Sequence, residues 1–198
     1  PGPGYGGSCF PKDAVALANT AADVNVTLRV LDAVISANTA RKAAMAERIA
    51  AILGGSVAGK RIAILGVAFK ANTDDMREAP ALDILPALQA AGAAIVAHDP
   101  KAMAEAARLM PTVGWAASPY AAARHADAVV VLTEWDAYRE LDFGRLRAAM
   151  AAPVVIDLRN ILPADAVVAA GLAYHGIGRG RPAQDGRIQQ RARRHVGN

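Results

Sequence analysis

The amino-acid sequence predicts an α/β protein in which a long connecting helix precedes a Rossmann-like, doubly wound parallel sheet. From residue 60 onward, short apolar runs such as residues 128–132 alternate with segments of helical spacing. Runs of this kind are typical of parallel strands that helices cover on both faces. A long amphipathic pattern over residues 26–53 comes before them. The composition is 54% hydrophobic but only 5% aromatic, so most apolar side chains are small. Small side chains allow helices to pack closely on a sheet.

The first part of the chain predicts a loop followed by two helices. Residues 1–11 are rich in proline and glycine and show no period, so they are predicted to form a loop. A first helix is predicted to begin at Lys12 or Asp13 and to end near residue 23. The longer helix over residues 26–53 follows, and the glycine pair at residues 54–55 ends it.

The rest of the chain predicts alternating strands and helices. Strands are predicted at residues 61–66, 94–98, 128–132, 154–157 and 172–175, with a poorly marked segment at 113–115. Helices are predicted at residues 79–91, 101–109, 119–125, 135–140, 142–150 and 163–170. In a doubly wound sheet, ligands bind at the carboxyl ends of the strands.

Three regions are predicted along the chain. Residues 1–54 would form a cysteine loop and central helices, and residues 60–179 a sheet domain. Residues 180–198 would form a basic, weakly structured tail. The charge supports this division, because residues 177–198 carry six arginines against one aspartate, whereas the whole chain has a net charge of only +4. A nucleic-acid groove would need basic residues and stacking aromatics on a folded element, so no nucleic-acid partner is predicted.

The composition also indicates the cellular compartment and argues against a membrane span and a metal site. The chain has one cysteine, which fits a reducing, cytoplasmic environment. No apolar run is long enough to predict a membrane span, and the first residues do not resemble a signal peptide. No cluster of cysteine and histidine has the spacing of a metal site, so no metal is predicted.

Cys9 lies in the segment PGPGYGGSCFPKD and has two interpretations. A lone cysteine is most often a small apolar filler. The neighbours of Cys9 are flexible or polar, however, and the dipole of a helix beginning just after it, together with Lys12, would lower the pKa of the thiol. Asp13 is close enough in the chain to orient a water or to cap the helix. The residues alone leave both a reactive and an inert thiol open.

The same segment also fits the dinucleotide pattern G-x-G-x-x-G over residues 2–7. A true fingerprint follows a strand and opens a helix, with an acidic residue at a later strand end. No strand is predicted before Gly2, and Asp23 falls at a helix break. The first predicted strand is followed by GVAFK (residues 66–70), which has a single glycine. Neither segment predicts a nicotinamide-binding loop.

Three motifs together resemble the UDP-glucose/GDP-mannose dehydrogenase family of nucleotide-sugar dehydrogenases. GYGGSCFPKD (residues 4–13) resembles the active-site segment of that family. GVAFK with TDDMRE (residues 73–78) resembles its second signature. VIDLRN (residues 155–160) with YHGIGR (174–179) resembles the C-terminal one. The resemblance extends over nearly the whole chain up to residue 179.

The resemblance implies a two-step oxidation of UDP-glucose to UDP-glucuronate with NAD. Cys9 would be the nucleophile that forms a thiohemiacetal and then a thioester, and Asp13 the acid that handles the water. Residues implied to bind the substrate are Tyr5, Gly6, Phe69, Lys70 and Arg159. Lys12 and Arg77 are implied to contact NAD, and the long helix to form a homodimer.

The family also has an N-terminal NAD-binding domain, whose motifs are not found here. The expectation is therefore that the chain is the C-terminal portion and is inactive alone. Alternatives remain: a non-catalytic module for nucleotide-sugar binding or oligomerisation, a thiol redox sensor, or a dehydrogenase for GDP-mannose or UDP-N-acetylmannosamine.

Overall fold

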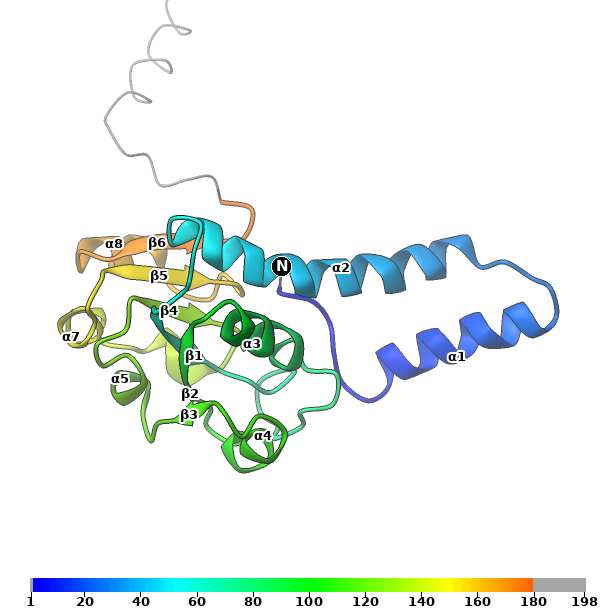
Figure 1. Ribbon diagram of the computed structural model, residues 1–198, viewed down its shortest axis with the longest axis horizontal. Coiled ribbons are helices and arrows are strands. Elements are labelled where there is room, and N and C mark those ends of the chain that lie inside the picture. The colour runs from blue at the N-terminus through cyan, green and yellow to red at the C-terminus, as the bar shows by residue number, and fades with distance from the viewer. Residues whose placement is uncertain (1, 180–198) are drawn as a thin grey trace, which may run out of the picture.

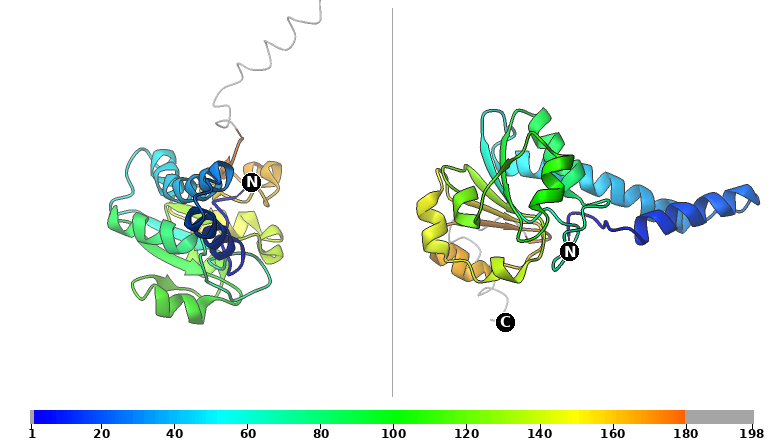
Figure 2. Two further views of the ribbon diagram at one scale, coloured as in Figure 1. Left: turned by 90° about the vertical axis from the view of Figure 1, so that its right-hand side faces the viewer. Right: turned by 90° about the horizontal axis from the view of Figure 1, so that it is seen from below.

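A computed structural model describes residues 2–179, so the predicted basic tail at 180–198 lies outside the described residues. Helices α1 (Phe10–Asp23) and α2 (Arg29–Ile52) come first and form a hairpin that projects from the body (Figures 1 and 2). Six strands and six shorter helices then alternate to form that body. The second half of α2 packs against the body, so the hairpin is attached along one helix.

The strands make one parallel sheet in the order β3-β2-β1-β4-β5-β6. Their bounds are β1 Arg61–Leu65, β2 Ala94–His98, β3 Gly114–Trp115, β4 Ala128–Val131, β5 Val154–Asp157 and β6 Ala173–Gly176. Both β2 and β4 flank β1, so the order of connection reverses there, and ligands of such sheets bind at this switch point. The predicted fold class, α/β with a Rossmann-like parallel sheet, is confirmed.

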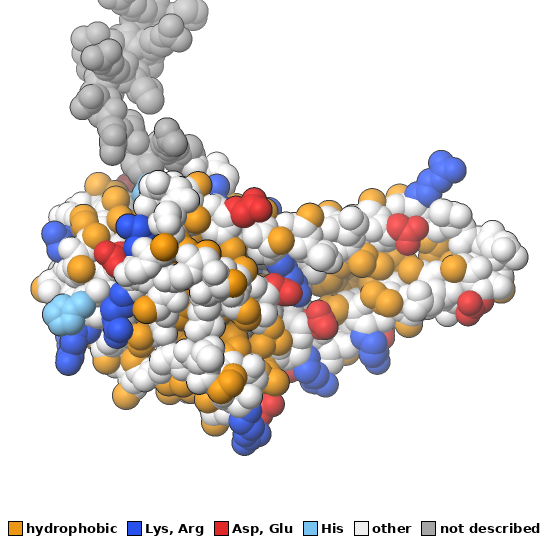
Figure 3. Space-filling view, viewed as in Figure 1, with side chains coloured by type: hydrophobic (Ala, Val, Ile, Leu, Met, Phe, Trp, Pro, Cys, Tyr) orange, Lys and Arg blue, Asp and Glu red, His pale blue; other side chains and the backbone are white. Residues whose placement is uncertain are grey.

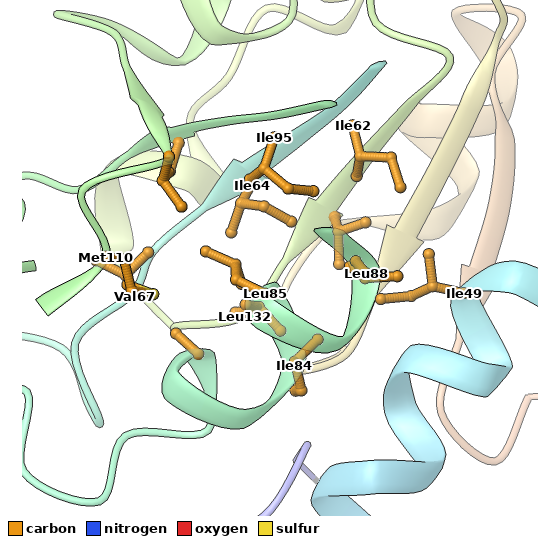
Figure 4. Packing of buried hydrophobic residues seen from close by; sticks show 14 of the residues in the cluster. Ile49, Ile62, Ile64, Val67, Ile84, Leu85, Leu88, Ile95, Met110 and Leu132 are labelled. Carbon is orange, nitrogen blue, oxygen red and sulfur yellow. The ribbon is translucent and has the colours of Figure 1, made fainter. Parts of the chain in front are cut away.

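Helices cover both faces of the sheet, and alternate strand residues point to each. On one face Ile62 and Ile64 pack against α2, α3 (Ala81–Ala90) and α4 (Met103–Leu109), as Figure 4 shows for Ile49 of α2 and Leu85 of α3. The other face is covered by α5 (Pro119–Ala122), α6 (Asp136–Arg139), α7 (Phe143–Ala149) and α8 (Ala164–Ala169). Burial on both faces explains why these strands consist of continuous apolar runs.

The first helix begins earlier than predicted. It starts at Phe10 rather than at Lys12 or Asp13, with Pro11 in its first turn. Proline suits that position because its fixed φ matches a helix. Its lack of an N–H costs nothing there, since N–H groups in the first turn have no partner within the helix. The prediction placed residues 1–11 wholly in a loop and was wrong for the last two. As a result Cys9 is the N-cap residue itself.

The segment between α2 and β1 is neither helix nor strand. Gly54, Gly55 and Gly59 within it all have positive φ, which ends α2 and turns the chain into the sheet. The boundary predicted at residues 54–59 lies within this segment. The division into domains stays a prediction, because Met45 and Ile49 of α2 belong to the same hydrophobic cluster as β1.

Candidate active site

The predicted site residues lie on loops at the carboxyl edge of the sheet, on the segment that precedes α1 and, for Lys12 and Asp13, in the first turn of α1. Residues 66–78 follow β1, residues 132–135 follow β4 and residues 158–163 follow β5. These three strands are neighbours in the sheet, so the loops that follow them are brought together. The fold thereby gathers sequence motifs that are about 60 to 150 residues apart at the switch point.

The cysteine loop, defined as residues 2–9, is docked on two elements. The amide of Asn38 on α2 binds the Tyr5 backbone in both directions: its Oδ1 accepts from Tyr5 N–H at 2.8 Å, and its Nδ2 donates to Tyr5 O at 3.2 Å. Gly7 N–H donates to the carbonyl of Arg77 at 2.8 Å. The loop is therefore fixed between α2 and the loop after β1.

Glycine is required at two positions of this docking. A Cβ on Gly6 would overlap the carbonyl of Glu78, and one on Gly7 would come within 2.8 Å of the Phe69 ring. Gly7 also has a φ of +91°, which side-chain-bearing residues rarely adopt. The glycines of the motif therefore serve close backbone packing and do not form a cofactor loop.

Cys9 is exposed and its backbone caps α1. Its carbonyl accepts from Asp13 N–H at 2.8 Å, and its Sγ lies 3.6 Å from Ser8 Oγ. The first-turn N–H groups of the 14-residue helix lie next to this residue. Asp13, one turn further on, has an exposed carboxylate 3.4 Å from Lys12 Nζ. The interpretation of Cys9 as a core-filling residue is wrong, because its side chain is in contact with solvent, and the reactivity of the thiol stays a prediction.

Arg159 connects all three loops. Its Nε donates to Leu132 O at 2.8 Å and lies 3.1 Å from Glu134 Oε2, while Nη2 donates to Phe69 O at 3.2 Å. Only 16% of the side chain is exposed, and burial lowers the pKa of its guanidinium while Glu134 opposes that change. A guanidinium stays charged even so, and Arg159 is a fixed cation at the edge of the sheet.

The loop after β1 carries three more predicted residues. Lys70 is exposed, with its Nζ 5.4 Å from the centre of the Phe69 ring. Arg77 is exposed and forms a bidentate pair with Asp75, with bonds of 2.7 and 2.9 Å. This pair lowers the pKa of Asp75 and raises that of Arg77. The Arg77 cation is therefore held in place by its neighbour two residues away.

Two hollows lie beside the cysteine loop. The larger, of about 640 Å³, is lined by Ser8, Lys12 and Arg77 among others. The other, of about 420 Å³, includes Tyr5 and Arg159. The two residues expected to contact the cofactor thus share one hollow, and two residues expected to contact the substrate share the other. Lys70 and Asp13 line neither.

Sequence reasoning assigned no site role to several residues that position this site. Asn38 is a single polar residue in the apolar stripe of the long helix and belongs to none of the three motifs. Lys42, one helical turn later, is 6% exposed and donates to Glu78 O at 3.2 Å and pairs with Asp83 at 2.9 Å. The spacing of Asn38 and Lys42 places both on one face of α2 and is the signal that was available. Nothing in the sequence marked Glu134.

Asp99 binds the backbone of the loop after β1. The side chain is completely buried at the end of β2, and its Oδ2 accepts from Val67 N–H, Ala68 N–H and Trp135 Nε1 at 2.8 to 3.1 Å. Its Oδ1 accepts two further backbone N–H groups, from residues 101 and 102, at 2.9 Å. One carboxylate therefore fixes the backbone immediately before Phe69 and Lys70.

The described residues offer a dinucleotide only peripheral contacts. Lys12 and Arg77 are exposed cations that fit an anionic group such as a phosphate. The loop after β1 has one glycine, Gly66, and α3 begins only at Ala81, so residues 2–179 hold no glycine-rich turn between a strand and a helix. Within the same residues, no three metal-binding side chains cluster, and no helix is long and apolar enough to span a membrane.

Comparison with known families and proteins gives consistent matches. Residues 63–164 match the UDP binding domain of the UDP-glucose/GDP-mannose dehydrogenase family, and residues 1–40 match its central domain. The chain is 47% identical over 178 residues to UDP-glucose 6-dehydrogenase of Rhizobium meliloti (strain 1021), covering 90% of this chain and 41% of the relative. A Bacillus subtilis (strain 168) UDP-glucose 6-dehydrogenase is 40% identical, covering 90% of this chain and 39% of the relative.

Solved structures show the same fold. A UDP-glucose dehydrogenase from Pyrobaculum islandicum superposes with a TM-score of 0.75 at 30% identity, covering 88% of this chain and 38% of that one. An NDP-N-acetyl-D-galactosaminuronic acid dehydrogenase from Methanosarcina mazei Go1 gives 0.78 at 29% identity, covering 90% and 39%. The chain thus spans about two-fifths of the length of the proteins it matches.

Proposed function

Because this chain belongs to the UDP-glucose/GDP-mannose dehydrogenase family, we propose that it is the part of a nucleotide-sugar dehydrogenase that carries the cysteine nucleophile and binds UDP-glucose. The observation that carries the proposal is the docking of the cysteine loop onto the loop after β1, through Gly7 N–H and the Arg77 carbonyl. This contact brings the segment that bears Cys9 to the ligand-binding edge of a Rossmann-like sheet.

In this proposal Cys9 attacks the aldehyde formed from the C6 alcohol of the sugar. The sulfur adds to the carbonyl carbon to give a thiohemiacetal, and a thiolate is nucleophilic enough for this near neutral pH. Exposure of Cys9 leaves the sulfur accessible to a substrate. Once the thiohemiacetal has lost a hydride and become a thioester, Asp13, one turn along α1, acts on the water that releases the acid from the sulfur.

Binding of the nucleotide sugar is assigned to the loops that Arg159 connects. Its guanidinium, together with the Lys70 ammonium, would pair with the diphosphate of UDP. The Phe69 backbone, Tyr5 and Gly6 would surround the sugar, since Gly6 lies against Phe69 of the loop after β1 and Tyr5 precedes Gly6 in the cysteine loop. Arg159 is already held by two carbonyls, so it would meet the ligand with little loss of side-chain freedom.

NAD, when bound, would accept the hydride in each oxidation, and Lys12 and Arg77 are the residues here that would contact its phosphates. These two cations are peripheral contacts, because residues 2–179 contain no dinucleotide loop. We therefore expect this chain by itself to bind UDP-glucose without reducing NAD. Formation of NADH by the purified chain with both compounds would contradict that expectation.

We further propose a cytoplasmic homodimer built on the α1–α2 hairpin. Seven large hydrophobic side chains on the hairpin are between 38% and 80% exposed: Phe10, Val15, Leu17, Val24, Val26, Val30 and Val34. Figure 3 shows hydrophobic side chains along this projection. Apolar surface of this kind is stabilised when another subunit covers it. The free thiol at Cys9 suits a reducing compartment.

The preference for UDP-glucose is supported by the relatives of 47% and 40% identity, which are UDP-glucose 6-dehydrogenases. GDP-mannose and UDP-N-acetylmannosamine remain the alternative substrates, because enzymes named for such sugars share the fold. Titration calorimetry of the chain with the three nucleotide sugars tests this choice. UDP-glucose is expected to bind at least tenfold more tightly than the other two.

Alkylation of Cys9 tests the proposed role of the thiol. Iodoacetamide is expected to modify Cys9 at pH 7, and saturating UDP-glucose is expected to slow the reaction at least fivefold. Arg159→Gln should abolish this protection, whereas the control Arg108→Gln on α4 should retain it. Fast alkylation that UDP-glucose does not affect would favour the redox-sensor alternative. Binding of UDP-glucose with an unreactive Cys9 would favour a non-catalytic binding module.

A further inference from the structure

A second hollow lies in the helical layer between α5 and α7, away from the cysteine loop. Its volume is about 440 Å³, within the range of roughly 300–1,000 Å³ that is usual for small-molecule sites. Its polar lining comes from Ser118, Tyr120, Arg124, His125 and Arg145, and three alanines supply an apolar wall. In the view of Figure 3, basic and histidine side chains gather over α5 and α7.

The side chains of this lining offer hydrogen-bond donors. Arg124 and Arg145 carry only donors, and within residues 2–179 neither forms an ion pair with a carboxylate. The hydroxyl oxygens of Ser118 and Tyr120 each accept a backbone N–H, at 3.1 and 2.9 Å, which leaves their O–H groups free to donate. A pocket of donors is best satisfied by a ligand that only accepts, which is an oxyanion.

The lining is held in place by the surrounding structure. The guanidinium carbon of Arg145 lies 4.1 Å from the centre of the Tyr120 ring, and Asp142 N–H fixes the hydroxyl of that ring. His125 has a φ of +57°, in the left-handed region, and its N–H donates to Ala149 O at 2.8 Å. This bond ties the loop before β4 to the end of α7. The Arg145 guanidinium and the backbone that carries Arg124 are therefore held in place without a ligand.

We propose that this hollow is a binding site for the phosphate group of a small molecule. Its donors come from three directions: from α5, from the loop before β4 and from α7. One guanidinium fork is enough for the two oxygens of a planar carboxylate, whereas donors from several sides suit the tetrahedral oxygens of a phosphate. The two cations, Arg124 and Arg145, also match the charge of a phosphate group.

This site is separate from the one proposed for UDP-glucose. Arg61, the first residue of β1, donates from Nε to the carbonyl of Arg124 at 2.9 Å, which places Arg124 at the amino end of that strand. Lys70 and Arg159 follow the carboxyl ends of β1 and β5. The inference therefore goes beyond the proposed function, and a ligand here can bind independently of the substrate.

Nuclear magnetic resonance of the full 198-residue chain tests the proposal, with inorganic pyrophosphate as the probe and saturating UDP-glucose present. The amide signals of Ala121 and Ala148 are expected to shift and to reach saturation. The double variant Arg124→Gln/Arg145→Gln should weaken this binding at least tenfold, and each single variant should weaken it less. The matched control Arg108→Gln, which changes the same charge on α4, should bind like the parent chain.

Three results would overturn the proposal. One is a shift at Ala121 and Ala148 that does not saturate, and another is equal binding by the double variant. The third is equal binding of citrate, a probe with several carboxylates, because it would show that phosphate is not selected. If the double variant does not fold, the two single variants carry the test. Loss of UDP-glucose binding alone would count against the proposed function and not against this site.

Discussion

At the residue scale, the loops of the candidate site are held together by buried side chains and not by the exposed residues that are proposed to contact ligands. Cys9, Asp13 and Lys70 are exposed and make few contacts, whereas Arg159 and Asp99 each bind backbone groups from more than one loop. The sequence motifs identified the first group, because a family resemblance points to residues that are expected to contact ligands. Asp99 carries no motif of its own, since its role depends on N–H groups that only the folded chain brings to it.

Asp99→Asn is expected to destabilise the protein by about 2–3 kcal/mol. An amide has one acceptor oxygen, so its NH₂ group would face backbone donors that the second carboxylate oxygen now satisfies, and buried unsatisfied groups cost about 1–3 kcal/mol each. Urea denaturation measures the change. Asp136→Asn, whose side chain is 83% exposed, is the control and should change the stability by less than about 0.5 kcal/mol. A similar effect of both substitutions would contradict the role of Asp99.

At the element scale, the sequence predicted the strands and most helices well and the ends of helices poorly. Continuous apolar runs identify buried strands, so β1, β2, β4 and β5 lie within one residue of their predicted bounds. The helix predicted at residues 119–125 is shorter, ending at Ala122, because His125 leaves the helical conformation to bond with α7. Such tertiary bonds leave no signal in a local pattern.

The hairpin gives a prediction at this scale. Val30 on α2 is 80% exposed, and Val30→Asp would place a charge in the apolar surface that the proposed partner covers. The parent chain is expected to sediment as a dimer and the variant as a monomer. Val168→Asp on α8, where the side chain is 56% exposed, is the control and should remain a dimer. A parent chain that is monomeric at every concentration would refute the proposed homodimer.

At the scale of the whole molecule, the order of the strands determines where the site lies. The sequence predicted a doubly wound sheet and therefore a site at the carboxyl ends of the strands, and the motif loops do meet there. It did not predict how the cysteine loop returns to that edge. The return depends on Asn38 of α2, whose partner is the Tyr5 backbone 33 residues away in the sequence.

The stability of the whole molecule is expected to fall as the pH is lowered from about 8 to about 5.5. Burial lowers the pKa of His98 and of His175 in the folded chain below the ordinary value of about 6.5. The unfolded chain then binds more protons in this range, so the free energy of unfolding decreases as the pH falls through about 6.5 toward the folded pKa. Asp99 opposes the shift at His98 only in part.

His98→Asn isolates this contribution. The Tyr138 hydroxyl donates to His98 O at 2.9 Å and lies 3.1 Å from His98 Nδ1, and the amide of asparagine can replace that ring contact but does not titrate. Urea denaturation at both pH values should show a smaller loss of stability for the variant than for the parent chain. An equal loss in the two proteins would mean that His98 contributes nothing to the pH dependence.

The position of Cys9 as the residue that caps α1 has a consequence for how the protein responds to dilution. The sulfur sits at one end of a helix whose exposed apolar side chains are the surface proposed to join two copies. The proposed dimer surface and the thiol are then on the same helix. Dissociation of the dimer would therefore expose the end of α1 that carries the thiol to solvent. The alkylation rate of Cys9 should consequently change over the concentration range in which the dimer dissociates, which makes the thiol a reporter of assembly.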